Sequence, residues 1–412
     1  MKQKKTAPRG CALARSRNMS QATALGARMC QGTSFHAVKF IIHPVLCKIS
    51  NSENTVCKSE LFVIYFPIFF SVVLLSNSLI LLYNNLIGAM IASGHGWEVV
   101  AMKNILFIAS EAVPFIKTGG LADVVGSLPK CFDKQYFDVR VMIPKYLCIK
   151  ESFRNEMKYV NHFYMDYLGQ NRYVGILEYE YEGVTFYFID NESYFWGDRP
   201  YGDWYYDLEK FSFFCKAALS SLPVIGFKPD VIHCHDWQTG LIPVHLKDKF
   251  HGGEFFRDIK SVMTIHNLKF QGVWDVKTIQ HFSELPDYYF TPDKLEAYKD
   301  GNMLKGGIVY ADAITTVSNT YAEEIKTPFY GEGLDGLMRA RSNSLRGILN
   351  GIDYDEFNPE TDKRIVQNYN AKTFRKEKSK NKKALQAELG LAQDEKKVHD
   401  RYCLPSDRPE GT

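Results

Sequence analysis

Short apolar runs alternate with stretches of helical periodicity along the chain after residue 102. The first run, Ile105–Ala109, has the length and composition of a buried parallel strand. A turn that contains Pro114 follows this run. Apolar residues then recur at the spacing of one helix face, at Leu121, Val124, Val125 and Leu128. The pattern therefore predicts a strand, a turn and a helix, in that order.

The alternation continues to about residue 317 and indicates the fold class. Further buried-strand patterns lie at Asp138–Pro144, Asp230–Cys234, Ser261–Ile265 and Ala313–Val317. Two more runs, Tyr173–Glu178 and Val184–Ile189, flank Glu182-Gly183 and predict a hairpin. Strands that alternate with helical segments are typical of an α/β protein with a Rossmann-like, doubly wound parallel sheet.

One helix and one loop are predicted between the hairpin and the next strand. Leu208–Leu222 predicts a helix whose apolar face is formed by Phe211, Phe214, Cys215 and Ala218. The preceding stretch, Tyr194–Tyr206, is rich in aromatic residues, Gly and Asp, and predicts a loop. Aromatic rings with carboxylates suit sugar binding, but a surface loop packed on its own rings explains the composition equally well.

Polar side chains and glycines follow three of the predicted strands. Ligands of open parallel sheets bind beyond the carboxyl ends of the strands. Gly119-Gly120 follows the first strand, His235-Asp236-Trp237 the Asp230 strand, and His266-Asn267 the Ser261 strand. We therefore expect these residues to meet at one rim of the sheet.

The turn after the first strand has the chemistry of an anion site. A helix that begins directly after a glycine turn offers free N–H groups and a positive dipole end. Gly119 and Gly120 allow close approach of the backbone, and Lys117 adds a positive charge. The alternative is an ordinary turn between a strand and a helix. The order of residues does not match a P-loop.

Other candidate motifs have plainer interpretations. His233 and His235 with Asp236 resemble metal ligands, but a retained metal needs a third or fourth ligand in reach, so no metal is expected. A lone histidine such as His266 often only caps a loop through hydrogen bonds. The spacing Gly331-x-Gly333-x-x-Gly336 fits a dinucleotide fingerprint, yet no strand precedes it, so we interpret it as a mobile loop. Glu323-Glu324 is interpreted as a solvated helix face.

Charge is unevenly distributed along the chain. The 412 residues have a formal charge of +3. Residues 1–101 contain ten Lys and Arg against three Glu, which gives them +7 and leaves −4 for residues 102–412. A mildly acidic globular part gives no support for nucleic-acid binding. Of the nine Cys, five lie after residue 102, without a C-x-x-C pair, which indicates free thiols in a reducing compartment.

Residues 1–101 differ from the rest. Leu61–Tyr83 is an apolar run of 23 residues, long enough for a membrane span, and basic residues precede it. An organelle transit peptide is a second interpretation. We favour a third one, a non-homologous extension translated from upstream DNA, because Met102 directly precedes the first strand and residues 1–101 show no amphipathic period. No membrane association is expected of the native protein.

Six motifs, in order, resemble those of bacterial-type glycogen synthases and ADP-glucose-dependent starch synthases. They are K-T-G-G-L-A-D-V (Lys117–Val124), H-C-H-D-W-Q-T-G-L (His233–Leu241), T-I-H-N-L-K-F-Q-G (Thr264–Gly272), T-T-V-S (Thr315–Ser318), E-G-L-D-G (Glu332–Gly336) and G-I-L-N-G-I-D (Gly347–Asp353). The resemblance extends from about Met102 to about Asp362 and covers neither end of the chain.

The resemblance implies a GT-B glycosyltransferase with two Rossmann-like halves. Its members transfer glucose from ADP-glucose to an α-1,4-glucan acceptor such as glycogen, with retention of configuration, and need no metal or other cofactor. It implies that Lys117, Gly119 and Gly120 bind the donor, and that His266 and Asp236 lie at the transferring sugar. It also implies a cytoplasmic location, or a plastid one if residues 1–101 are a genuine transit peptide.

The end of the chain, after about Asp362, departs from the family. We expect residues 102–354 to form the first Rossmann-like domain and 355–397 a linker and the start of a truncated second domain. Residues 398–412 are interpreted as a frameshifted tail, because codons that encode them can be chosen to read F-M-I-G-I-V-S-R-L-T-D-Q-K-G in another frame. We expect such a chain to be inactive alone. The alternative is a non-catalytic, single Rossmann-like domain that binds glucan or nucleotide.

Overall fold

The computed structural model describes residues 102–392. The predicted run Leu61–Tyr83 and the tail at 398–412 lie outside this range. Within it, nine strands form one sheet in the order β12-β11-β7-β6-β1-β2-β5-β4-β3. The strands are β1 (Lys103–Ile108), β2 (Phe137–Pro144), β3 (Lys158–Tyr167), β4 (Gln170–Tyr181), β5 (Val184–Asp190), β6 (Val231–His235), β7 (Lys260–Ile265), β11 (Ala313–Thr316) and β12 (Leu345–Gly347).

The sheet is parallel from β12 to β5, and β4 and β3 extend it in antiparallel fashion. The α/β prediction of a doubly wound, mostly parallel sheet is confirmed. The predicted hairpin is also present, and Glu182 and Gly183 both have positive φ in its turn, as a type I′ hairpin requires. A second, small sheet has the order β8-β10-β9 and comprises β8 (Val273–Asp275), β9 (Glu296–Ala297) and β10 (Asp300–Asn302).

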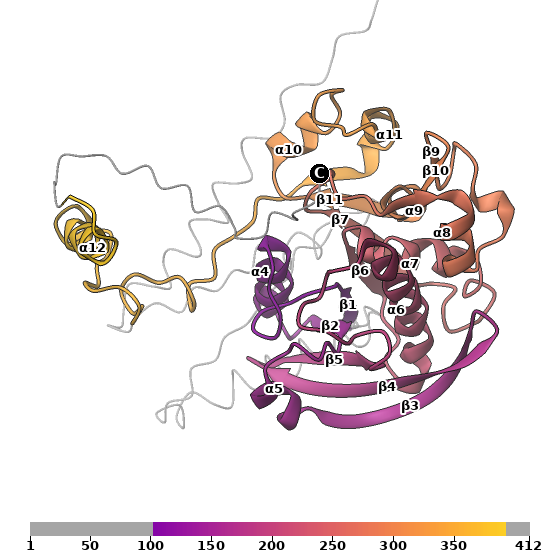
Figure 1. Cartoon of the computed structure of the whole chain (residues 1–412), viewed down its shortest axis with the longest axis horizontal. Coiled ribbons are helices and arrows are strands. Elements are labelled where there is room, and N and C mark those ends of the chain that lie inside the picture. Colours follow the sequence, from indigo (N-terminus) through magenta and orange to yellow (C-terminus); the bar gives the residue numbers. More distant parts are fainter. Residues whose placement is uncertain (1–101, 393–412) are drawn as a thin grey trace, which may run out of the picture. The chain divides into compact units, whose positions relative to one another are not determined.

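Helices pack on both sides of the large sheet. They are α4 (Gly120–Ser127), α5 (Glu151–Glu156), α6 (Trp204–Val224), α7 (Leu241–Lys247), α8 (Val276–Ser283), α9 (Met303–Tyr310), α10 (Asn319–Glu324), α11 (Asp335–Ala340) and α12 (Phe374–Glu388). Short 3-10 turns are η1 (Leu128–Cys131), η2 (Trp237–Thr239), η3 (Asp287–Tyr289) and η4 (Ser342–Ser344). Figure 1 shows α6 and α7 on one side of the sheet and α4 on the other, as right-handed crossovers require.

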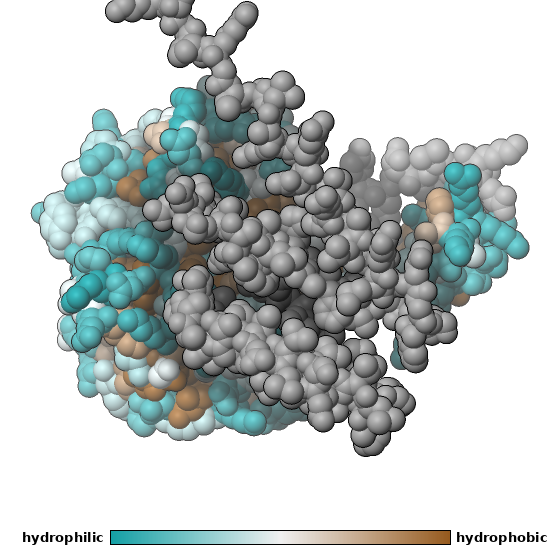
Figure 2. Space-filling view, turned by 180° about the vertical axis from the view of Figure 1, so that it is seen from behind, coloured by the Kyte–Doolittle hydropathy of each residue, from teal (hydrophilic) through white to brown (hydrophobic). Residues whose placement is uncertain are grey.

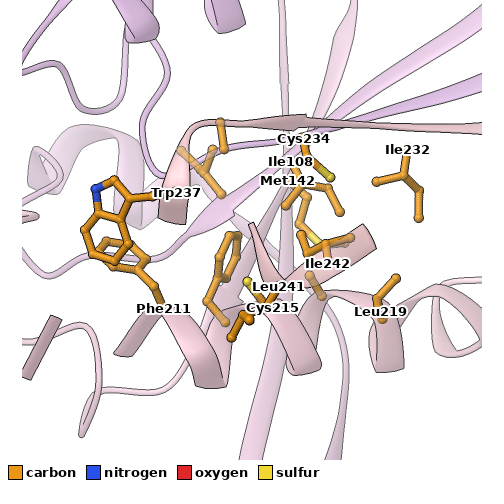
Figure 3. Close-up of a cluster of buried hydrophobic side chains, with 14 of the residues drawn as sticks. Ile108, Met142, Phe211, Cys215, Leu219, Ile232, Cys234, Trp237, Leu241 and Ile242 are labelled. Carbon is orange, nitrogen blue, oxygen red and sulfur yellow. The ribbon is translucent and has the colours of Figure 1, made fainter. Parts of the chain in front are cut away.

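The core on the α6 side is formed by apolar residues of three strands and two helices. Figure 3 shows Cys215 and Leu219 of α6 and Leu241 and Ile242 of α7 against a set of strand residues, Ile108, Met142, Ile232 and Cys234. The predicted face of α6 is buried in full, and additional residues of this helix are buried on its other sides. Helix α6 is therefore a central element and not a surface helix.

Two predicted boundaries were wrong. Leu128 was placed on the apolar face of the first helix, but α4 ends at Ser127 and Leu128 is exposed. Pro129 is the cause, because proline has no N–H to continue the helical hydrogen bonds, and the chain goes on from Leu128 as the 3-10 turn η1. The predicted loop also ends earlier, since Asp203 caps α6 by accepting hydrogen bonds from the N–H groups of Tyr205 and Tyr206.

A close approach of α7 to α9 depends on glycine. A Cβ on Gly240 would lie 2.3 Å from the carbonyl oxygen of Met303, and a Cβ on Gly307 would lie 3.1 Å from the Cα of Gly240. Backbone atoms cannot swing aside as a flexible side chain does. We expect Gly240→Ala to lower the free energy of unfolding by about 3 kcal/mol, the upper range for overpacking. Urea denaturation measures this, with Gly252→Ala, which meets nothing within 4 Å, as the control. Equal stability of the two variants would contradict the expectation.

Helix α12 belongs to the segment predicted as a linker and the start of a second domain. Its residues are mostly exposed, and its surface is largely hydrophilic in Figure 2. No strand or helix lies between β12 and α12. The division of the chain into domains remains a prediction.

Within residues 102–392, no helix is long and apolar enough to cross a membrane. The cysteines described there, Cys131, Cys148, Cys215 and Cys234, are free thiols, as predicted.

Candidate functional site

The carboxyl ends of three neighbouring strands bring the predicted site residues together. Strands β7, β6 and β1 are adjacent in the sheet, and their registers align Ile108 with Cys234 and His235 with Thr264. The glycine turn follows β1 after a loop of residues 109–116, whereas Asp236 and His266 directly follow β6 and β7. Two contacts join the second and third of these segments. The N–H of His266 donates to Oδ1 of Asp236 at 2.7 Å, and Nε2 of His266 lies 3.0 Å from Nδ1 of His235.

The turn after β1 is held by a buried carboxylate. Glu111 is only 3% exposed. Its carboxylate accepts hydrogen bonds from the backbone N–H of Thr118 at 2.5 Å and from the Thr118 hydroxyl at 3.2 Å. Glu111 therefore fixes the residue between Lys117 and Gly119. Sequence reasoning did not single out Glu111, although an acidic residue directly after a buried strand was a visible signal.

Neither glycine of the turn is required by the protein's own packing. Gly119 has φ −150° and ψ −167°, an extended conformation that any residue adopts. A Cβ on either Gly119 or Gly120 would meet nothing within 4 Å among the described residues. Gly119 is the N-cap of α4. It has no side chain, so no capping side chain accepts a hydrogen bond from the first N–H groups of this helix. The open space and these donors together suit an anionic ligand that approaches the backbone.

Lys117 lies at the same turn in a half-exposed ion pair. Its Nζ is 2.7 Å from Oδ1 of Asp123 in α4 and 5.8 Å from the centre of the Phe357 ring. A pair of this exposure contributes about 0–1 kcal/mol, so a diphosphate can replace Asp123 as the partner of the lysine at little cost. Asp123, which lies in α4 beside the turn, is a second residue to which sequence reasoning assigned no role.

Asp236 has a backbone conformation that is rare outside glycine. Its φ is 55° and its ψ is −173°. Its N–H donates to the carbonyl of Thr264 at 3.0 Å, and the Thr239 hydroxyl donates to its carbonyl at 3.2 Å. Burial raises the pKa of Asp236 to about 7, although hydrogen bonds from the N–H groups of His266 and Asn267 act against this. One oxygen of Asp236 thus holds the β7 loop, and this placement costs backbone strain.

Burial also raises the pKa of Glu111 to about 7, against the hydrogen bonds from Thr118. The native carboxyl thus keeps its proton up to about pH 7, whereas an unfolded one loses it near about pH 4.3. The stability from this proton is present at low pH and is lost as the pH rises to about 7. We expect Glu111→Gln, which mimics the protonated form, to gain about 3 kcal/mol more in the free energy of unfolding between pH 5 and pH 8 than the wild type does, because the variant lacks this loss.

The measurement for Glu111 is urea denaturation of both proteins at pH 5 and pH 8. Glu182→Gln, at an exposed acid paired with Lys130, is the matched control and should keep the wild-type pH dependence. If the change in stability between these pH values were the same in Glu111→Gln and in the wild type, Glu111 would be ionised in the native turn throughout.

The structure also places the other candidate motifs, which are the histidine pair, the glycine fingerprint and the acidic helix face. The rings of His233 and His235 stack at 4.4 Å, and no group of three His, Cys, Asp or Glu within residues 102–392 is arranged to hold a metal ion. Gly331 and Gly333 lie in a turn, and Gly336 lies inside α11 with no strand before it. Glu323 is exposed in α10, as predicted for a solvated face.

Comparison with known proteins identifies the family to which the chain belongs. The sequence model described as the starch synthase catalytic domain matches residues 104–340, which is more than half of the chain. This chain belongs to the starch synthase catalytic domain family. The match includes the glycine turn, Asp236 and His266, and it ends before α12.

Similar proteins carry related names. A protein named glycogen synthase from Lachnospira eligens is 71% identical over 296 residues, which are 72% of this chain and 62% of that protein. A glycogen synthase from Lachnoclostridium phytofermentans is 64% identical over 72% of this chain and 62% of its own length. The chain thus spans about three fifths of the length of these relatives.

A solved structure of the family shares the fold. It is the catalytic domain of starch synthase IV from Arabidopsis thaliana, bound to ADP and acarbose. Its TM-score to this chain is 0.66 at 33% sequence identity, over 71% of this chain and 60% of that one. That structure supports the GT-B assignment of the sheet described above.

Proposed function

We propose that this starch synthase family member provides the N-terminal half of a glycogen synthase. The complete enzyme would transfer glucose from ADP-glucose to the non-reducing end of an α-1,4-glucan such as glycogen, with retention of configuration. The observation on which the proposal mainly rests is the 71% identity to a protein named glycogen synthase over 296 residues.

The chemistry of the rim supports this reaction. Cleavage of the bond between glucose and the diphosphate leaves negative charge on the departing ADP. Lys117 and the N–H groups at Gly119 and Gly120 lie where positive charge and aligned dipoles would stabilise that charge. Such groups accelerate a reaction because they interact more strongly with the transition state than with the ground state. The solved relative bound to ADP supports an ADP-linked donor.

His266 and Asp236 would act on the sugar side. We assign His266 to a contact with a hydroxyl of the transferring glucose. One oxygen of Asp236 is occupied by the N–H of His266, and its other oxygen would face the sugar or the acceptor. In this proposal ADP-glucose is a substrate, no separate cofactor takes part, and the enzyme acts in the cytoplasm without a membrane or nucleic-acid partner.

A chimera tests this function. It consists of this chain up to residue 392, followed by the part of the Lachnospira eligens relative that the match does not cover. We expect it to transfer glucose from ADP-glucose in strong preference to UDP-glucose. Proton NMR of the product should show that the new glycosidic linkage is α. A preference for UDP-glucose would contradict the donor assignment, and a β-linkage would contradict retention. A folded chimera that binds glucan without transfer would favour the alternative, non-catalytic function.

A further inference from the structure

Two buried imidazoles meet at the carboxyl ends of β6 and β7. Nδ1 of His235 lies 3.0 Å from Nε2 of His266. The His235 ring stacks on His233 at 4.4 Å and on Phe107 at 5.4 Å, with interplanar angles of 26° and 24°. The backbone of His235 is clamped as well, because its N–H donates to the Thr239 hydroxyl at 2.7 Å and its carbonyl accepts from that hydroxyl at 2.9 Å. The orientation of the His235 ring is therefore fixed by packing.

Both rings are neutral at pH 7. His235 is fully buried, and burial lowers its pKa well below the ordinary value. Burial also lowers the pKa of His266 to about 4. A neutral imidazole has one N–H donor and one nitrogen that accepts. In the contact between them, one ring must therefore donate and the other must accept.

The far nitrogen of His235 decides the direction of this hydrogen bond. Nε2 of His235 is buried and has no hydrogen-bond partner among the residues that the structure describes. If His266 donated, His235 would have to carry its own proton on this unpartnered nitrogen, and buried N–H groups without an acceptor are rarer than acceptors without a donor. The favoured arrangement therefore has His235 donating from Nδ1 to Nε2 of His266.

The direction of this hydrogen bond determines which group His266 presents at the rim. If Nε2 of His266 accepts, the proton of His266 is on Nδ1. This nitrogen forms no hydrogen bond with any residue in the described range 102–392, so its N–H is available to a ligand. With the opposite tautomer, His266 would present an acceptor there instead of a donor.

We propose that His235 is a positioning residue that holds His266 in its Nδ1–H tautomer, and that this N–H donates to a hydroxyl oxygen of the transferring sugar. The tautomer follows from the geometry of this chain alone. Its use in sugar binding rests on the proposed function.

Nitrogen NMR of the full chain with labelled histidine tests the tautomer. The two ring nitrogens of a neutral imidazole give separate signals, one of the N–H type and one of the bare type. For His266, assigned by its loss in His266→Gln, we expect the N–H type at Nδ1 and the bare type at Nε2. The reverse assignment in the wild type would overturn the proposal without any variant.

Three variants test whether His235 is the cause. His235→Leu removes the donor, so His266 should shift toward the Nε2–H form that free histidine favours in water. His235→Asn places an amide N–H near the position of Nδ1 and should keep the Nδ1–H form. His245→Leu is the matched control, since His245 is another buried imidazole but lies in α7, and its ring nitrogens have no hydrogen-bond partner among the described residues. An unchanged Nδ1–H signal in folded His235→Leu would overturn the role of His235. If His235→Leu does not fold, a mixed or reversed tautomer in folded His235→Asn would do so.

Kinetics of the chimera separate this role from packing. His235→Leu should lower kcat at least about tenfold, a loss of one hydrogen bond to the reacting sugar. His235→Asn should recover most of the loss, whereas His245→Leu should keep the parent kcat. No recovery in His235→Asn would contradict the positioning role. If the unmodified chimera were inactive, the proposed function would fail while the NMR result would still decide the tautomer.

Discussion

Replacing Lys117 by Ala is expected to weaken ADP-glucose binding to the chimera by at least about tenfold and to slow turnover, while the fold survives. Hydrogen bonds to charged groups contribute about 1.5–3 kcal/mol, and about 1.4 kcal/mol corresponds to a factor of ten. The loss also leaves Asp123 unpaired at 38% side-chain exposure beside the approaching diphosphate. Calorimetric titration with ADP-glucose and initial rates measure both effects.

Two variants control this experiment. Lys117→Arg should recover only part of the affinity, because a planar guanidinium does not replace a compact ammonium in a tight turn. Lys103→Ala removes another half-exposed lysine, at the opposite end of β1 in a pair with Asp230, and should leave binding unchanged. Binding should also weaken as salt rises. If Lys117→Ala left affinity and turnover within about twofold of the parent, the turn would have only a structural role.

Acidification from pH 7 to pH 5 is expected to destabilise the chain strongly. Burial lowers the pKa of four histidines, to about 3 for His233 and His245, to about 4 for His266, and well below the ordinary value for His235. Unfolded histidine has a pKa near about 6.5, so below that pH the unfolded chain binds protons that the native chain does not. Each histidine then removes about 1.4 kcal/mol of stability for each pH unit.

Two carboxyls act in the opposite direction. Glu111 and Asp236, both with a pKa of about 7, keep a proton in the native state that the unfolded state releases between about pH 4 and pH 7. Four histidines against two carboxyls leave a net loss of about 3 kcal/mol for each unit below pH 6. Urea denaturation at pH 7, 6 and 5 measures this slope. Stability that is constant or rises on acidification would show that these histidines are protonated in the native state.

His245 offers a separate check of the same account. Both of its ring nitrogens are buried without a hydrogen-bond partner, and it lies in α7, outside the rim. His245→Leu should therefore cost little at pH 7 and should reduce the acid slope by about 1.4 kcal/mol for each pH unit, the share of one histidine. An unchanged slope would show that His245 contributes nothing to the acid sensitivity.

The strands and helices of the sheet could be predicted where burial imposes a pattern. The run Ile105–Ala109 is apolar because β1 lies in the centre of the sheet, and its successor α4 shows the spacing of one buried face. In contrast, strand β3 (Lys158–Tyr167) was not predicted. It lies at the edge of the sheet with most of its residues exposed, so no face of it needs an apolar period.

The site at the rim, like the fold, could be predicted only in part. The strand ends are visible in the sequence, and the rule for parallel sheets predicts from them that Asp236 and His266 lie at one edge. The contacts of Glu111 with Thr118 and of His235 with His266 could not be predicted, because they depend on the path of a turn and on side-chain rotamers. Periodicity describes which side of an element a residue faces, but not which atom it reaches.

Transfer of radiolabelled glucose from ADP-glucose to glycogen by the chimera tests the central claim most directly. Its rate should be compared with that of the intact Lachnospira eligens relative and with that relative's C-terminal part alone. Because this chain supplies the glycine turn, Asp236 and His266, we expect incorporation within about tenfold of the intact relative, a difference below about 1.4 kcal/mol in the barrier. A folded chimera with no more incorporation than the C-terminal part alone would contradict it.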